Sequence, residues 1–305
     1  MTDWTLVAVR FGVYLTLGAL FGLSAFGLYA LRAGERGDVL ALRGWLAIVA
    51  ALGLVLSASW LVFLSSSMAE IPAWPIDRSA IDAVLSGSAI GTAWKIRIIA
   101  LLVAGATALR IRWLPLTVLA SAVALATLAW TGHGSIDEGT VGWVHLGADM
   151  LHLIASAAWI GALLGLVLLV LQPVARIDSD HLELTHRALH GFGTIGTVVV
   201  TTLIVTGLVN SWLMIGFDHI ATLPTTRYGQ LLIAKLALFA LMLGLAALNR
   251  FRLTPAFERS IADASHARAL RELRLSLAIE ATSVIAILGL VAWLGTLAPP
   301  AAATT

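Results

Sequence analysis

Long runs of apolar residues, separated by short polar segments, dominate the pattern of the chain. About eight such runs can be delimited, at 5–31, 44–67, 93–109, 114–131, 142–171, 191–216, 228–249 and 275–297. A helix needs about 20 apolar residues to cross the hydrocarbon core of a bilayer, and in lipid its backbone groups must pair within the same segment. The pattern therefore predicts an all-α integral membrane protein, a bundle of about eight transmembrane helices forming a single polytopic domain over residues 1–305.

The composition supports an embedding in the lipid bilayer and argues against other classes. Of the 305 residues, 59% are hydrophobic and 12% are charged, and the mean hydropathy is +0.94. A soluble domain is usually about 45–50% apolar and about 25% charged. A net charge of +2 gives no support to a nucleic-acid partner, and no GxxxxGK[ST] phosphate loop indicates a nucleotide. Because the chain has no cysteine, disulfides, iron–sulfur clusters and thiolate metal sites are excluded.

Arginine residues are distributed unequally between alternate loops. Thirteen of them lie in 32–43, 110–113, 172–190 and 250–274. The alternate loops contain only Arg78 and Arg227. Because loops rich in Lys and Arg stay in the cytoplasm, the first set is expected to be cytoplasmic, and eight spans then place both termini outside. The longest outer loop, 68–92, is predicted to contain a short interfacial helix.

The fifth apolar run contains the chemically most informative pattern. His145, Asp149 and His152 fall within about 60° of one another on a helix that turns by about 100° per residue. Polar groups on one face of a spanning helix are expected to face the protein interior. An unpaired charge in the membrane costs at least about 2.5–3.5 kcal/mol, so these groups need a partner. A bound cation would serve, and imidazole and carboxylate groups are suitable ligands for copper or zinc.

Two neighbouring residues extend this metal-site hypothesis. His133 lies between two glycines just before the fifth run, within about ten residues of it, and can approach His145 and Asp149. Met150 supplies a thioether, which suits Cu(I), whereas His and Asp suit Cu(II), so the oxidation state stays open. The predicted metal ligands are therefore His133, His145, Asp149, His152 and Met150.

Other polar residues inside the apolar runs also require partners. Thr202, Thr206 and Asn210 form a stripe on the sixth run, and hydrogen bonding between helices is its favoured role. The alternative is a charged relay that leads from Asp149 through Asn210 toward Glu280.

Two charged residues in the last two runs have expected partners of a different kind. Lys235 is expected to extend its ammonium group to the membrane interface. Glu280 is expected to pair with Arg274 or Arg250. The histidines of the cytoplasmic segment, His181, His186 and His190, are expected to form a solvated basic face.

Several segments between about 130 and 300 resemble the CopD/PcoD family of copper-resistance proteins of the bacterial inner membrane. The matching segments are Gly132-His133, Asp149-x-x-His152, Ala158-Trp159-Ile160-Gly161, Phe192-Gly193-Thr194, Thr206-Gly207-Leu208-Val209-Asn210, Thr226-Arg227-Tyr228-Gly229-Gln230-Leu231-Leu232, Lys235, Asn249-Arg250-Phe251-Arg252-Leu253, Glu280 and Leu294-Gly295-Thr296-Leu297. The resemblance implies an eight-helix protein that handles copper ions in the inner (plasma) membrane, and the arginine distribution makes its termini periplasmic. It also implies a separate periplasmic copper-binding partner of the CopC type, because this chain has no CopC-like domain.

The leading hypothesis from the sequence is a copper permease that takes copper from the periplasm across the inner membrane, without enzymatic activity. Without a nucleotide-binding motif, transport would be passive or coupled to another ion. Two alternatives stay open. One is a membrane redox protein that holds haem b or a metal through histidines. The other is an assembly factor that delivers copper to a respiratory oxidase without transporting it.

Overall fold

The computed structural model describes residues 3–38, 41–131, 139–171, 179–216, 220–262 and 266–297. Eight of its helical segments are long and apolar enough to cross a membrane, and within these ranges there is no β-strand. They are α1 (Trp4–Tyr29), α3 (Leu42–Met68), α5 (Ala89–Ala108), α6 (Leu114–Ala126) with the 3-10 turn Thr127–Thr131, α7 (Gly139–Val170), α8 (Ser179–Ile215), α9 (Arg227–Leu248) and α11 (His266–Leu294). The predicted all-α transmembrane fold is confirmed.

Shorter helical elements occupy most of the described connections. They are α2 (Glu35–Asp38), α4 (Arg78–Gly87), the 3-10 helices Ile111–Trp113 and Ile220–Thr225, a π-helix over Asn249–Leu253, and α10 (Thr254–Ala262). Helix α4 falls in the segment where the sequence predicts an interfacial helix. Asp77 caps its first turn, because Asp77 Oδ1 accepts a hydrogen bond of 2.7 Å from the backbone N–H of Ser79. Its position at a lipid interface stays a prediction.

Two segments expected to be loops are largely helical. Helix α8 begins at Ser179, well before the apolar run at 191, and α11 begins at His266 rather than near 275. The apolar pattern marks only the part of a helix that contacts lipid or core. A helix can continue beyond the hydrocarbon region with polar side chains, because water and side chains satisfy its terminal backbone groups.

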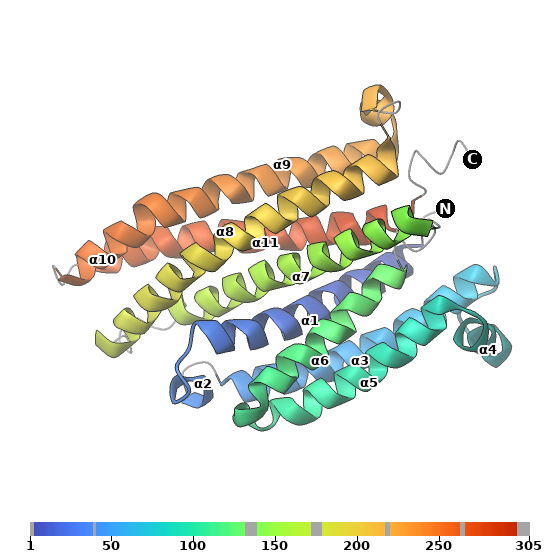
Figure 1. Cartoon of the computed structure of the whole chain (residues 1–305), viewed down its shortest axis with the longest axis horizontal. Coiled ribbons are helices and arrows are strands. Elements are labelled where there is room, and N and C mark those ends of the chain that lie inside the picture. The colour runs from blue at the N-terminus through green and yellow to red at the C-terminus, as the bar shows by residue number, and fades with distance from the viewer. Residues whose placement is uncertain are drawn as a thin grey trace.

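The long helices lie side by side along the length of the molecule, with α7 between the two halves of the chain (Figure 1). On one side α7 packs against α1, which also contacts α3 and α6. On the other side α7 packs against α8 and α11, and α11 contacts α9. Helix α7, which carries the predicted metal ligands, is therefore central to the bundle.

Glycines allow α1 and α7 to approach closely. A Cβ atom built on Gly161 of α7 would overlap the backbone of Gly22 of α1, and one built on Gly22 would overlap the carbonyl oxygen of Ala157. Small residues at such crossings let helix backbones make direct van der Waals contact, which is the main source of helix association in lipid. This contact fixes the position of α7 against the N-terminal half.

The beginning of α1 and the end of α11 lie at the same end of the bundle, which we call the terminal end (Figure 1). The rings of Trp4 and Trp293 are 4.9 Å apart there. The opposite end, formed by α2, the first turns of α8 and α10, we call the arginine-rich end. There Arg187 Nη2 of α8 lies 2.6 Å from Glu35 Oε1 of α2. Which end faces the cytoplasm stays a prediction.

Candidate functional site

The polar face of α7 points toward α8, inside the protein. His152 Nδ1 lies 2.9 Å from the Thr206 hydroxyl, and Asn210 Nδ2 donates a hydrogen bond of 2.6 Å to Asp149 Oδ1. His145 is buried one turn nearer the terminal end. The expected role of the α8 stripe in hydrogen bonding between helices is thereby confirmed for Thr206 and Asn210. We call His145, Asp149 and His152 the α7 stripe.

Helix α9 adds a positive charge and a phenol to this region. Lys235 is half-buried and interacts electrostatically with the carboxylate of Asp149 and with His152. No ion pair joins Lys235 to an acidic side chain among the described residues, so the expected extension of its ammonium group to the interface stays a prediction. Tyr228 is buried one helical turn or more nearer the terminal end, and its hydroxyl donates to Met214 Sδ at 3.8 Å.

The described residues do not assemble the five predicted ligands around one point. They contain no group of three or more His, Asp or Glu side chains placed to hold a metal ion. His133 lies outside the described residues. Met150 follows Asp149 directly, so a rotation of about 100° turns it away from the α7 stripe. A copper ion would therefore have to draw the ligands closer together.

A second polar cluster lies toward the terminal end, between α1, α5 and the turn after α6. Arg97 is fully buried, and its Nε donates a hydrogen bond of 2.9 Å to the Thr127 hydroxyl. Its guanidinium carbon lies 5.1 Å from the centre of the Trp60 ring, a cation–π contact. Arg10 Nη2 donates a hydrogen bond of 3.1 Å to the Tyr14 hydroxyl, one turn along the same face of α1.

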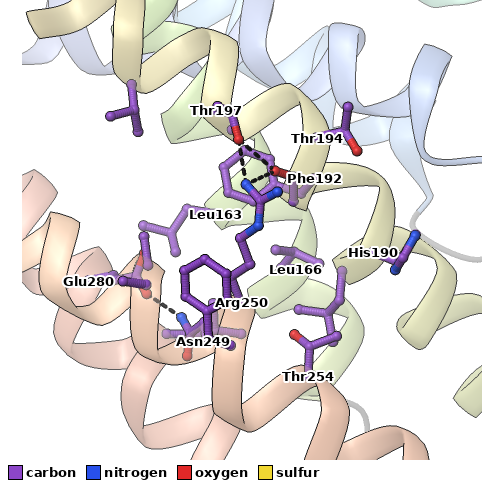
Figure 2. Close-up of a pocket in the computed structure, with 18 of the residues that line it drawn as sticks. Leu163, Leu166, His190, Phe192, Thr194, Thr197, Asn249, Arg250, Thr254 and Glu280 are labelled. Carbon is purple, nitrogen blue, oxygen red and sulfur yellow. Dashed lines mark hydrogen bonds between the residues drawn. The ribbon is translucent and has the colours of Figure 1, made fainter.

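A cavity of about 540 Å³ opens between α7, α8, α9, α10 and α11, nearer the arginine-rich end (Figure 2). Trp159, two turns along α7 from His152, lines it. Glu280 of α11 is 2% exposed and accepts a hydrogen bond from Asn249 Nδ2. The periodicity of single helices does not predict this cavity, because its walls come from these five helices and from the π-helix.

The expected ion pairs of Glu280 are wrong. Arg250 Nη1 points away from it and donates to the Gly193 carbonyl at 2.7 Å and to the Thr197 hydroxyl (Figure 2). Arg274 Nε donates to the Val170 carbonyl at 2.6 Å. Asn249 therefore takes the place beside Glu280 on α11, and the next residue, Arg250, turns toward α8.

Two of the histidines expected on a solvated face line the cavity. His186 is half-buried, and its Nε2 lies 3.6 Å from Glu258 Oε2 of α10. The ring centres of His186 and His190 are 6.3 Å apart. His181 Nε2 lies 2.9 Å from the Leu169 carbonyl. The contact of His186 with Glu258 depends on α10, which lies in a segment expected to be a loop.

Comparisons with known proteins identify relatives over almost the whole chain. Residues 1–143 match the model of the copper resistance protein D-like N-terminal domain, and residues 186–294 match that of copper resistance protein D. The α7 stripe lies between the two matched segments, whereas Thr206, Asn210, Lys235 and Glu280 lie inside the second. No solved structure matches the chain.

Individual relatives extend over different shares of the chain. Copper resistance protein D of Pseudomonas syringae pv. tomato is 42% identical over 306 residues, covering 98% of each chain. Inner membrane protein YebZ of Escherichia coli K12 is 28% identical over 84% of this chain and 86% of its own. Copper transport protein CutJ of Bacillus subtilis is 32% identical over 126 residues, which are 41% of this chain and 22% of CutJ.

Proposed function

Because this chain belongs to the copper resistance protein D family, we propose that it is a permease of the bacterial inner membrane that takes copper from the periplasm and passes it inward. The names of two relatives, copper resistance protein D and copper transport protein CutJ, support copper as the substrate. The observation that carries the proposal is the α7 stripe, whose imidazoles and carboxylate meet polar side chains of α8 and α9 inside an eight-helix bundle.

The α7 stripe is the proposed entry site for the ion. His145, Asp149 and His152 are the groups that would receive copper there, and His133 and Met150, the other two predicted ligands, would have to join them when the ion binds. Imidazole, carboxylate and thioether ligands together accommodate both oxidation states of the ion. The position of His145, Asp149 and His152 in the half of α7 nearer the terminal end agrees with the periplasmic termini that the arginine distribution predicts.

The hydrogen bonds of the stripe are weak enough for copper to replace them. A hydrogen bond to a charged group contributes about 1.5–3 kcal/mol, so the Asn210 bond to Asp149 is at most of that size, and the Thr206 bond to His152 is weaker. Micromolar ion binding supplies about 8 kcal/mol. The same bonds hold Asp149 and His152 toward α8 before the ion arrives.

Helix α7 links the entry site to the cavity. Trp159 follows His152 by seven residues, which is about 10 Å along a helix, and its indole lines the cavity. An ion that leaves His152 therefore has a short step to a space that is nearer the arginine-rich, predicted cytoplasmic, end. No phosphate-loop motif supplies ATP hydrolysis, so the movement is passive or coupled to another ion.

A separate periplasmic protein of the CopC type is the proposed copper donor. It would deliver the ion at the terminal end, where α7 begins. Binding of such a protein to the reconstituted permease, with and without copper, tests this part of the proposal.

Copper uptake into proteoliposomes tests the permease function. Asp149→Asn and His152→Gln keep the size and polarity of the side chains but weaken the entry site, and each is expected to reduce uptake at least about tenfold, the lower range for disturbing a metal site. His181→Gln, a histidine of α8 at the arginine-rich end, is the matched control and should transport normally. Equal uptake by wild type and both stripe variants, each monodisperse in detergent, would contradict the proposal. Copper binding without any uptake would instead favour the assembly-factor alternative.

A further inference from the structure

Glu280 is a buried carboxyl group in the membrane-spanning part of the bundle, and the proposed entry site does not use it. It lies 14 residues from the start of α11, with 2% of its surface exposed, on the wall of the cavity. Ionisable side chains at such positions are rare and are functional sites by default, because an unpaired charge in the membrane is costly. Its environment therefore indicates what it does.

Burial opposes the charged form of the Glu280 carboxyl group. The hydrogen bond that Asn249 donates offsets only part of this cost, because a neutral amide supplies no opposite charge, and the nearby indole of Trp159 is also uncharged. Among the described residues, no ion pair joins Glu280 to Lys, Arg or His. A buried carboxyl group without a cation takes up a proton, since the charged form loses its hydration without compensation.

The cavity supplies a route for that proton. Its volume of about 540 Å³ is enough for on the order of ten water molecules at about 30 Å³ each. The titratable or charged groups that share it with Glu280 are His186 and His190 of α8, Arg250 of the π-helix and Glu258 of α10. The side chains that α7 and α9 contribute to the cavity wall carry no titratable group; they are Trp159, Leu163, Leu166, Leu243, Ala246 and Ala247. Three of the polar groups, His190, Arg250 and Glu258, are exposed, so the cavity reaches the surface near the arginine-rich end.

The π-helix is a second, independent feature of this place. It covers Asn249–Leu253 at the junction of α9 and α10. Single π-helical turns are uncommon and occur frequently at functional sites, because they interrupt the regular ladder of backbone hydrogen bonds. Here the turn brings the amide of Asn249 to Glu280 and leaves the carboxyl group facing the cavity (Figure 2).

We propose that Glu280 is a proton-carrying group that exchanges its proton for the charge of copper as the ion passes through the cavity. When copper arrives, Glu280 releases one proton to cavity water, and the resulting carboxylate balances one positive charge of the ion. When copper leaves, a proton from the same water returns. This inference rests on the proposed function. It means that protons in the solution on the cavity side compete with copper for Glu280.

The pH dependence of copper uptake tests the competition. In wild-type proteoliposomes, acidifying the solution on the cavity side should slow uptake by up to about tenfold per pH unit once Glu280 stays protonated. Glu280→Gln, which mimics the protonated group, should be slow and independent of pH, whereas Glu280→Asp should keep a pH dependence. Glu272→Gln is the matched control, because Glu272 lies on the same helix and, within the described part of the chain, its ion pair is with exposed Arg268.

Infrared spectroscopy provides a readout that does not require transport. Purified protein at neutral pH should show the absorption of a neutral carboxyl group that Glu280→Gln removes and Glu272→Gln retains. An unchanged band in Glu280→Gln, or a pH dependence of uptake unaltered by that substitution, would overturn this inference and leave the permease proposal intact. If the wild type moved no copper at any pH, the permease proposal would fail, and so would the proposed exchange of a proton for copper at Glu280.

Discussion

The contact between α1 and α7 provides the sharpest test of the architecture, through the substitution Gly161→Ala. The added methyl group would overlap the backbone of Gly22, which cannot move aside as a flexible side chain can. Overpacking of this kind costs about 1–3 kcal/mol. Alanine gains about 0.8–1 kcal/mol over glycine in helix propensity, so a net destabilisation of up to about 2 kcal/mol is expected, or more if the helices separate.

Gly147→Ala is the matched control, because Gly147 is on the same helix and an added Cβ would meet open space. It should stabilise the protein slightly or leave it unchanged. Unfolding of both variants in mixed detergent micelles, followed by circular dichroism or tryptophan fluorescence, gives the two free energies. If Gly161→Ala were as stable as Gly147→Ala, the close crossing of α1 and α7 would be refuted.

Three further predictions concern polar contacts. Partial burial opposes ionisation of Glu35, but the Arg32 backbone and the Arg187 guanidinium outweigh it and hold the pKa of Glu35 below the ordinary 4.5. The resulting stabilisation, about 0.2–1 kcal/mol, is complete above pH 4.5 and is lost as the pH falls below the lowered pKa. Arg187→Ala should remove the share of this acid dependence that the guanidinium contributes, which thermal unfolding at several pH values measures. Asn210→Leu leaves Asp149 without its amide donor and should destabilise by about 1–3 kcal/mol, measurable by detergent unfolding; an unchanged stability would show that the bond does not matter. Asp77→Ala should speed amide exchange in the first turn of α4, where the capping bonds are lost.

The sequence by itself determined the class of the fold. Apolar runs such as 44–67 and 142–171 are long enough to cross a bilayer. Because the number of predicted spans is even, the first and last helices are expected to have their outer ends on the same side, and the contact of Trp4 with Trp293 confirms this. The sequence also determined that the α7 stripe faces inward, because the period of a single helix places residues three, four and seven apart on one face.

The partners of these groups were decided by the tertiary structure. Thr206 and Asn210 meet the α7 stripe only because α8 packs against α7. Similarly, Glu280 faces a cavity and Asn249 rather than an arginine, because a π-helix and α10 stand where the charge pattern indicated a loop. The physical reason is that lipid is as apolar as the helix surfaces, so the hydrophobic pattern marks which segments enter the membrane but leaves the choice of neighbours to close packing and to hydrogen bonds between distant residues.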